Sequence, residues 1–338
     1  MKAAVLKSAY HVVVEDVPKP EVKPGHVLLN LKASAICGTD VGLYKGKVPV
    51  AMPRIIGHES AGQIVEVGQG VTSVKPGDRV VLNPLIFCRQ CFYCFEGKTN
   101  LCENGGLRGR ESDGTFAEFV VVPEYNVAKI SDSISYDDAT SLVALATVYQ
   151  AQRKVNIVPG ETVAVLGQGA AGLLHTQLAR LAGARPVYAI TRSQWKLDIA
   201  KTYGAETING GETDPVAVVR ENTGGRGADV VIESVGHEAT IRQAMEMVRP
   251  GGRVLLFGIT GPVINNFYGY AMYYKDLSLI GSRAMTPYDF ELSIRAVESG
   301  ALSLGSIVTH RFPLDDIVDA LNLVDKRPGD ALRVVINI

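Results

Sequence analysis

The first part of the chain, up to about residue 146, alternates hydrophobic and polar positions in short runs. Examples are VVVEDVP, HVLLNLKA, GQIVEVG, DRVVLNP and FAEFVVVP, which are separated by segments rich in Gly and Pro. Alternation with a period of two places one face of each segment in a core, as in half-buried strands. We therefore expect a barrel-like β domain in this part of the chain.

From about residue 147 the pattern changes to strands that alternate with helices. TVAVLG precedes an apolar helix that contains Leu173, Leu174, Leu178 and Leu181 and ends at Gly183. Further strand-like segments follow, with helical segments between most of them: PVYAI, ETI, ADVVIES, GGRVLLFG and DLSLIG. This alternation favours an α/β fold with a parallel, doubly wound sheet. The pattern predicts six strands in that sheet.

The tail after Arg283 has a third pattern. It predicts two amphipathic helices, at Tyr288–Ser299 and Asp315–Val324, and a last strand, LRVVINI. Because so short a tail cannot bury a core of its own, we expect it to return to the first domain. The predicted domains are residues 1–146 with 284–338, and residues 147–283.

Composition and charge narrow the classes of partner. The 338 residues exceed the size of one core, are 46% hydrophobic and 20% charged, and include no apolar run long enough to cross a bilayer. The 34 basic and 35 acidic residues are dispersed, so neither nucleic acid nor a membrane surface is an expected partner. The opening MKAAVLKS lacks the features of a secretory signal. We expect a cytoplasmic protein that binds a small molecule.

The glycine-rich segment GQGAAG, residues 167–172, follows a predicted buried strand and opens a helix. In that context glycines permit a tight turn, close approach of the backbone to a pyrophosphate and close helix packing. The phosphates would lie at the N-terminus of the helix. The alternative is a turn that binds no ligand. The predicted dinucleotide contacts are Gly167, Gly169, Ala170, Ala171 and Gly172, together with Val235, Gly258 and Ile259.

The end of the second predicted strand bears on the choice of cofactor. An acid commonly stands there when the ribose has a free 2′-hydroxyl, but this chain has Thr191, Arg192 and Ser193. A guanidinium beside a hydroxyl can bind a 2′-phosphate, which a carboxylate would repel. The sequence therefore favours NADP(H) over NAD(H). In the alternative, Arg192 stacks on the adenine and Thr191 contacts the ribose of NAD(H).

Four of the five cysteines occur in the spacing C-x2-C-x2-C-x7-C. Thiols of a cytoplasmic protein are kept reduced, so the cluster indicates a metal rather than disulfides. Four thiolates complete a tetrahedron around Zn²⁺ and leave no position for a substrate, as in a structural site. An iron–sulfur cluster is the chemical alternative. The predicted ligands are Cys88, Cys91, Cys94 and Cys102.

A second set of metal-binding side chains lies nearer the N-terminus. The fifth cysteine, Cys37, stands in ICGTD, and GHE follows with His58 and Glu59. A thiolate, an imidazole and a carboxylate from two loops leave room for an open coordination position, as in catalytic zinc sites.

Together these motifs resemble the zinc-containing medium-chain dehydrogenase/reductase family, which includes alcohol, sorbitol and threonine dehydrogenases. The resemblance covers the whole chain, and GHE, the four cysteines, GTFAEFVVVP, VPGETVAVLGQGAAG, ADVVIESVG, VRPGGRVLLFG and LRVVINI occur in the family's order. It implies a GroES-like catalytic domain and a Rossmann domain with the active site in the cleft between them. It also implies a homo-oligomer, either a dimer or a tetramer.

The resemblance further implies roles for individual residues. Cys37 and His58 would be ligands of a catalytic zinc, and Glu59 the adjacent carboxylate that can exchange on and off the metal. Three other residues would contact the substrate alcohol, the nicotinamide and the cofactor diphosphate, respectively: Thr39, Thr147 and Arg333.

Two positions depart from the family pattern. A third ligand, Cys, Asp or Glu, usually stands four residues before the threonine near the nicotinamide, where this chain has Val143. A relay histidine is common five residues after the first ligand, where this chain has Gly42. The expected metal site is then Cys37, His58 and Glu59 with water. A weak or absent catalytic metal is the alternative.

The resulting functional hypothesis is zinc-dependent hydride transfer between NADP(H) and a secondary alcohol or ketone. Residues 42–49 and 265–276 are rich in Tyr, Asn and Lys, which suits a polyol or sugar-derived substrate. Sorbitol dehydrogenases usually have a Phe-Arg-Tyr run where this chain has GSRAM, so the resemblance argues against sorbitol itself as the substrate. Other hypotheses are a zinc-independent NADPH enone or quinone reductase, and a non-catalytic nucleotide-binding protein. Subunit contacts would equally explain the tyrosines of the second segment: Tyr268, Tyr270, Tyr273 and Tyr274.

Overall fold

The computed structural model describes residues 1–258, 269–326 and 329–338. Its residues form two compact units, Met1–Ala146 with Met285–Ile338, and Thr147–Ala284. The boundary after Ala146 falls inside helix α4, Ser141–Val155. Of the predicted cofactor contacts, Ile259 lies outside the described residues.

The first unit contains a seven-stranded sheet centred on β3, His26–Ala35. β3 pairs in antiparallel fashion with β5 along one edge. Along its other edge it pairs with β9 near its start and with β18 near its end. Alternating residues of β3, including Leu29 and Leu31, are fully buried in one hydrophobic cluster. The other strands of this sheet are β5 (Glu59–Val67), β6 (Arg79–Leu82), β9 (Phe119–Pro123), β10 (Val127–Lys129), β17 (Val308–Pro313) and β18 (Arg333–Asn337).

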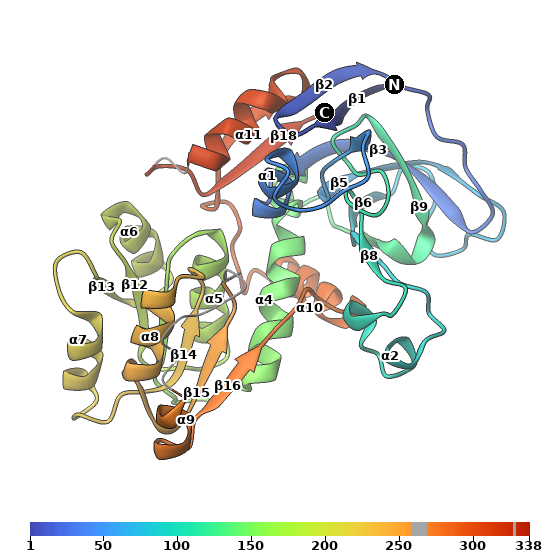
Figure 1. Cartoon of the computed structure of the whole chain (residues 1–338). Helices are drawn as coiled ribbons and strands as arrows, with labels where there is room; N and C mark the ends of the chain where they lie inside the picture. The colour runs from blue at the N-terminus through green and yellow to red at the C-terminus, as the bar shows by residue number, and fades with distance from the viewer. Residues whose placement is uncertain (259–268, 327–328) are drawn as a thin grey trace. The chain divides into compact units, whose positions relative to one another are not determined.

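Smaller elements complete the first unit. A three-stranded sheet in the order β2-β1-β4 shares a core with helices α1 and α11, in which Phe116 is fully buried. A two-stranded ribbon, β7 and β8, carries the segment with the four cysteines (Figure 1). The bounds are β1 (Lys2–Ser8), β2 (His11–Asp16), β4 (Arg54–Ile55), β7 (Leu85–Ile86), β8 (Gly106–Leu107), α1 (Gly38–Tyr44), α2 (Phe92–Phe95) and α3 (Tyr136–Ala139).

The tail belongs to this first unit and adds β17 and β18 to its sheet. Helix α10, Pro287–Glu298, begins at a capping box in which Thr286 and Asp289 satisfy each other's backbone N–H groups. The second predicted helix begins differently from the expectation. Residues Leu314–Asp316 form a 3₁₀ turn after Pro313, and α11 runs from Ile317 to Lys326.

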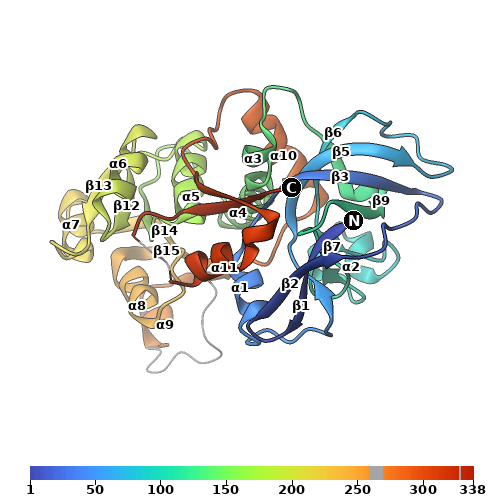
Figure 2. The ribbon, with the colours of Figure 1, turned by 90° about the horizontal axis from the view of Figure 1, so that it is seen from above.

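The second unit is a doubly wound α/β fold, which confirms the predicted fold class. Its six parallel strands lie in the order β13-β12-β11-β14-β15-β16. Helices α5 and α6 cover one face, and α7 and α8 the other (Figures 1 and 2). The bounds are β11 (Val163–Leu166), β12 (Val187–Thr191), β13 (Glu206–Asn209), β14 (Ala228–Glu233), β15 (Val248–Leu256), β16 (Ser278–Gly281), α5 (Ala170–Leu181), α6 (Gln194–Thr202), α7 (Pro215–Asn222), α8 (Glu238–Met247) and α9 (Tyr270–Tyr274).

The strand order of this sheet reverses between β11 and β14, because β12 follows β11 on one side and β14 lies on the other. In open α/β sheets ligands bind at such a reversal, beyond the carboxyl ends of the strands. The glycine-rich turn after β11 lies at this position.

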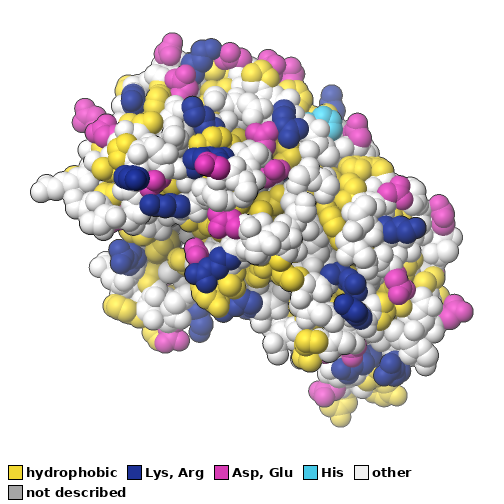
Figure 3. Space-filling model, turned by 180° about the vertical axis from the view of Figure 1, so that it is seen from behind, with side chains coloured by type: hydrophobic (Ala, Val, Ile, Leu, Met, Phe, Trp, Pro, Cys, Tyr) yellow, Lys and Arg dark blue, Asp and Glu magenta, His cyan; other side chains and the backbone are white. Residues whose placement is uncertain are grey.

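The surface carries both signs of charge. On the face shown in Figure 3, basic and acidic side chains are interspersed with hydrophobic ones. Among the described helices, none has the length and the apolar character that a membrane span requires.

Candidate metal and dinucleotide sites

The four clustered cysteines converge as the spacing predicts. The sulfur atoms of Cys88, Cys91, Cys94 and Cys102 all lie within 4.8 Å of one another. Cys102 Sγ is 3.5 Å from Cys88 Sγ and 3.8 Å from Cys91 Sγ. A tetrahedron with metal–sulfur bonds of about 2.3 Å has edges of about 3.8 Å, so the arrangement fits one zinc ion. All four donors are protein side chains, which closes the shell.

The thiols of this group have different proton affinities. Backbone hydrogen bonding at Gln90 is the main influence that lowers the pKa of Cys88 to about 6. Burial is the main influence that raises the pKa of Cys94 to about 12. Four sulfur atoms this close together cannot all be thiolates without a cation to balance their charge. A metal ion supplies that charge.

A second cluster joins Cys37, His58 and Glu59, whose ligand atoms also lie within 4.8 Å of one another. Cys37 is the N-cap of α1, and His58 and Glu59 stand where the chain enters β5. Thr39 Oγ1 lies 3.9 Å from Cys37 Sγ. Three different donors from two loops fit a zinc ion that retains an open coordination position.

Asp40 links the two loops of this cluster. Its carboxylate is fully buried and accepts hydrogen bonds from the backbone N–H groups of Cys37 (2.8 Å) and Gly57 (3.2 Å). It also lies 3.1 Å from Nδ1 of His58. A carboxylate at Nδ1 fixes the orientation of the imidazole and leaves Nε2 for a metal. The sequence analysis gave Asp40 no role, although the CGTD motif contains it.

The same carboxylate opposes the effect of burial on the pKa of His58. Burial alone would lower the pKa of His58, but the charge of Asp40 and the hydrogen bond to it outweigh burial and hold the pKa well above its usual value. Cys37 acts in the same direction. The imidazole therefore lies in a strongly anionic environment, which favours a cation.

Glu59 is held from the other side by the C-terminal strand. Arg333 Nη2 lies 2.5 Å from a carboxylate oxygen of Glu59, and both side chains are buried. The same nitrogen donates to the carbonyl of Thr140 at 2.7 Å. From the sequence, Arg333 is expected to contact the cofactor diphosphate, and the ion pair with Glu59 is not expected. The residues are 274 positions apart, so no local pattern signals it.

The glycine-rich turn of the second unit packs closely against the start of α5. Gly167 has a φ of +87°, and a Cβ on Gly172 would lie 1.9 Å from the carbonyl O of Gly167. The turn and the start of α5 therefore pack backbone against backbone. Gly169 is the N-cap of α5, a Cβ there would meet nothing within 4 Å, and no side chain caps the helix. The first N–H groups of α5, at Ala170 and Ala171, are thus available to an anion.

The loop after β14 packs against this turn, and the end of β15 packs against that loop. A Cβ on Gly167 would lie 2.6 Å from the side chain of Val235, and one on Gly258 would lie 2.1 Å from the backbone N of Gly236. The fully buried carboxylate of Glu233 accepts hydrogen bonds from the N–H groups of Val235 (2.9 Å) and Gly236 (3.0 Å). Glu233 is a second organising acid that the sequence analysis did not single out.

The end of β12 has no carboxylate. Thr191 is half-buried, Arg192 is exposed, and Ser193 is the N-cap of α6 without a capping hydrogen bond from its side chain. Lys196 stands in the first turn of α6, with Nζ 5.3 Å from the ring centroid of Trp195. Thr147, predicted near the nicotinamide, lies in α4 and is half-buried.

Two sequence families match the chain. "Alcohol dehydrogenase GroES-like domain" matches residues 23–132, and "Zinc-binding dehydrogenase" matches residues 170–299. A probable D-xylulose reductase A of Emericella nidulans is 33% identical over 343 aligned residues, which cover 98% of this chain and 95% of the relative. The chain belongs to the zinc-containing medium-chain dehydrogenase/reductase family. It is an oxidoreductase of the alcohol dehydrogenase type, with zinc and a nicotinamide cofactor.

Other members of this family extend the comparison. An L-threonine 3-dehydrogenase of Pyrococcus abyssi is 34% identical, over 97% of this chain and 96% of the relative. A structure from Sinorhizobium meliloti 1021, solved with bound NADP, has a TM-score of 0.93 and 31% identity and covers 100% of this chain and 99% of its own.

The two departures from the family pattern have different structural settings. Val143, at the usual third-ligand position, is buried in α4 with 3% exposure. At Gly42, a Cβ would lie 2.8 Å from Cγ2 of Val48, and the backbone N–H groups of Lys47 and Val48 donate to the carbonyl of Gly42. The side chain of Val48 therefore occupies the space that the Cβ of a histidine at position 42 would need.

Asp40→Asn tests the role of the carboxylate in the second cluster. The amide oxygen of asparagine can still accept hydrogen bonds at one of the two carboxylate positions. Its NH₂ group, at the other position, cannot accept a hydrogen bond. We expect the affinity of the Cys37 cluster for zinc to fall about 10-fold to 100-fold, the usual effect of losing such a partner of a ligand. Zinc per chain, measured after dialysis against increasing chelator, checks this.

The matched control is Asp289→Asn, because Asp289 is also fully buried and also occupies the third position of a helix with a capping box. Equal zinc loss in the two variants would mean that Asp40 acts only through general stability.

Proposed function

We propose that the chain catalyses hydride transfer between NADP(H) and a secondary alcohol or ketone at the Cys37, His58 and Glu59 cluster. The observation that carries the proposal is the open set of three donors, with its imidazole oriented by Asp40 and a hydroxyl, that of Thr39, beside it. When bound, zinc supplies a Lewis acid for the substrate oxygen, and the nicotinamide supplies or accepts the hydride.

The residues of the chain then have separate tasks. Cys37, His58 and Glu59 hold the metal, and Asp40 keeps the imidazole in one tautomer. Arg333 restrains the carboxylate of Glu59. Thr39 orients the substrate oxygen and takes part in moving its proton. Because the turn at Gly42 fills the place of a relay histidine, we propose that water completes the proton transfer.

The preference for NADP(H) is supported by the end of β12. Arg192 is exposed there, Ser193 has a hydroxyl that no capping bond uses, and Lys196 adds a second cation in the first turn of α6. A 2′-phosphate would form charge-assisted hydrogen bonds with such groups. The bound NADP of the Sinorhizobium meliloti relative is in keeping with this assignment. The contacts of Thr147 with the nicotinamide and of Arg333 with the diphosphate remain predictions.

For the substrate we propose a polyol, a sugar derivative or a related small hydroxylated molecule. Two relatives are named as a probable D-xylulose reductase and an L-threonine 3-dehydrogenase, and both names denote small hydroxylated substrates. Of the tyrosines considered for the substrate region, Tyr268 lies outside the described residues. Tyr273 and Tyr274 are 82% and 75% exposed on α9, which favours the alternative that they contact another subunit.

Zinc content distinguishes the proposal from a zinc-independent reductase on the same fold. We expect about two zinc ions per chain in protein purified without chelator, one in each cluster. Cys37→Ser should reduce this to about one and abolish ketone reduction, because the second cluster loses its thiolate. Metal analysis together with NADPH consumption provides the measurement. If the wild type holds one zinc ion that Cys37→Ser does not remove, the zinc-dependent mechanism is wrong.

Arg192→Ala tests the choice of cofactor. Loss of a charge-assisted bond of about 1.5–3 kcal/mol predicts a roughly 10-fold to 100-fold fall in kcat/KM for NADPH, with little change for NADH. Arg242→Ala, an exposed arginine on α8 of the same unit, is the control. Equal losses with the two cofactors would refute the 2′-phosphate contact.

We also propose that two copies of the chain associate through β16 and α9. Among the described strands β16 has β15 as its one neighbour, so its outer edge is open, and Tyr273 and Tyr274 are exposed nearby. An open edge and an aromatic patch are features that association covers. The homo-oligomer would be a dimer, or a tetramer built from such dimers.

The double substitution Tyr273→Glu with Tyr274→Glu should lower the molar mass measured by sedimentation equilibrium, because charge in a buried interface opposes association. Tyr288→Glu, at an exposed tyrosine of the other unit, should leave the mass unchanged. An unchanged mass for the double variant would place the subunit interface elsewhere.

A further inference from the structure

Residues 105–116, the connector, join the segment of four cysteines to the second metal cluster. The connector starts three residues after Cys102, and its first N–H, at Gly105, donates to the carbonyl of Cys102 at 3.1 Å. Leu107 pairs with Leu85, and the N–H of Arg108 donates to the carbonyl of Pro84 at 3.0 Å. The cysteine segment is therefore clamped where the chain enters it and where the chain leaves it.

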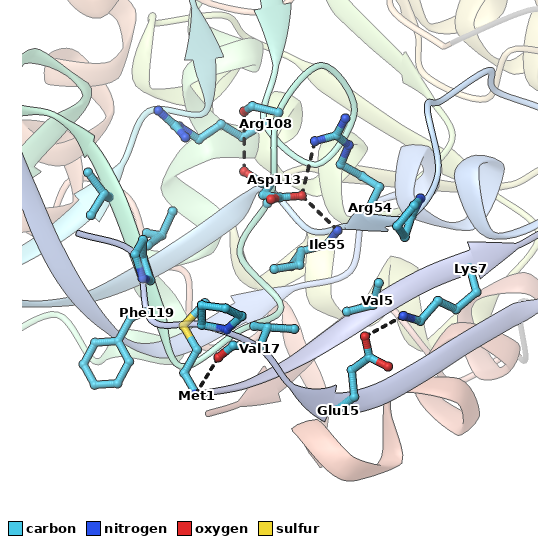
Figure 4. Close-up of a pocket in the computed structure, with 17 residues that line it drawn as sticks. Met1, Val5, Lys7, Glu15, Val17, Arg54, Ile55, Arg108, Asp113 and Phe119 are labelled. Atoms are coloured by element: carbon cyan, nitrogen blue, oxygen red, sulfur yellow. Dashed lines mark hydrogen bonds and ion pairs between the residues drawn. The ribbon is translucent and has the colours of Figure 1, made fainter. Parts of the chain in front are cut away.

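The far end of the connector is bound to the residues that lead into His58. The N–H of Gly114 donates to the carbonyl of Ile55 at 2.7 Å, and the N–H of Thr115 donates to that of Gly57 at 3.0 Å. The carboxylate of Asp113 accepts from Nη1 of Arg54 (3.2 Å) and from the N–H of Ile55 (3.3 Å), as Figure 4 shows.

Three glycines allow the connector and the segment before His58 to approach each other closely. Gly57 has a φ of +95°, and a Cβ on it would lie 2.8 Å from the ring of Phe116. A Cβ on Gly109 would lie 2.7 Å from the carbonyl O of Gly57, and one on Gly114 would lie 2.3 Å from the same oxygen. A side chain at Gly109 or Gly114 would therefore displace the peptide of Gly57.

Gly57 forms hydrogen bonds with both the connector and the Asp40 carboxylate. Its carbonyl accepts from the connector, while its N–H donates to Asp40, which also holds Nδ1 of His58. A displacement of the connector therefore changes the position of the peptide that precedes His58.

We propose that Gly109 and Asp113 are positioning residues for His58. They fix the connector against Gly57 and Ile55, so that the metal-bound cysteine segment anchors the imidazole of the second cluster. The inference rests on the proposed function in one respect, namely that the second cluster binds a metal. It assigns to the four-cysteine site an effect on the affinity of the other site, beyond stabilisation of the fold.

Residues on the outer side of the connector can be substituted without disturbing the hydrophobic core. Ser112, Asp113 and Gly114 line a cavity of about 470 Å³, and the Asp113 side chain is 62% exposed (Figure 4). In this view the Arg108 side chain extends away from Asp113. Asp113 can thus be replaced without creating a void.

The first experiment compares Gly109→Ala with Gly70→Ala. Gly70 has a φ of +84°, close to the +81° of Gly109, but a Cβ there meets nothing within 4 Å. Both variants have the backbone strain, and only Gly109→Ala presses on Gly57. Each protein is dialysed against chelator until about one zinc per chain remains, which the closed four-thiolate shell should retain. Co²⁺ is then titrated into the second cluster and its visible absorption recorded.

We expect the dissociation constant for Co²⁺ to rise about tenfold or more in Gly109→Ala, with an altered absorption band, and to stay within about twofold of wild type in Gly70→Ala. The retained zinc should be the same in both. Equal Co²⁺ affinities and spectra in the two variants would overturn the inference.

A second pair of variants decides the matter if Gly109→Ala does not fold. Asp113→Ala removes the acceptor for Arg54 and Ile55, whereas Asp113→Asn retains a carbonyl oxygen in its place. Weaker Co²⁺ binding in Asp113→Ala, restored in Asp113→Asn, supports the inference, and equal binding in both contradicts it. A wild type that takes up no Co²⁺ refutes the proposed function as well. A wild type that binds Co²⁺ as tightly as every variant refutes the positioning role alone.

Discussion

The buried carboxylate of Asp40 holds together the loops on which the second metal cluster depends. It has no exposed surface, and three N–H groups converge on it, from Cys37, Gly57 and the His58 ring. A buried carboxylate that lost these donors would be strongly destabilised, so the two loops cannot separate without a large penalty. The side chains of Cys37 and His58 therefore keep their relative positions before a metal binds. The ion pair between Glu59 and Arg333 extends the same network to the C-terminal strand.

The two clusters of metal-binding side chains differ in their donors, and we propose different roles for them. Four thiolates complete a shell and leave nothing for a substrate, whereas thiolate, imidazole and carboxylate leave a coordination position open. Val143 stands where members of this family usually have a further ligand, so we expect the second cluster to depend on the groups that orient its three donors. In the second unit, Glu233 plays a comparable organising role: it holds the loop after β14 against the glycine-rich turn through backbone N–H groups. Both units thus use a buried acid to position backbone at a site.

The periodic parts of the fold were predictable because they depend on local chemistry. Alternating residues predicted β3 and its neighbours, and the strand–helix alternation predicted the six-stranded parallel sheet. Helix α10 begins where Thr286 and Asp289 form a capping box, close to the expected Tyr288. The start of α11 was less accurate, because a 3₁₀ turn at Leu314–Asp316 replaces the first helical turn that amphipathic periodicity suggested. Hydrophobic periodicity indicates which face of a segment is buried, but it does not distinguish a 3₁₀ turn from a turn of α-helix.

The sequence by itself determined the donor sets and the family, because metal ligation and nucleotide binding require particular residue types at short spacings: C-x2-C-x2-C-x7-C, CGTD, GHE and GQGAAG. Only the tertiary structure decided which groups orient those donors. The pair of Arg333 with Glu59 joins residues 274 positions apart, and the contact of Gly109 with Gly57 depends on two turns whose backbones touch. No local pattern encodes such contacts, because they arise only when separate segments pack into one core. For the same reason the tight turn at Gly42, closed by Val48, became evident only in the folded chain.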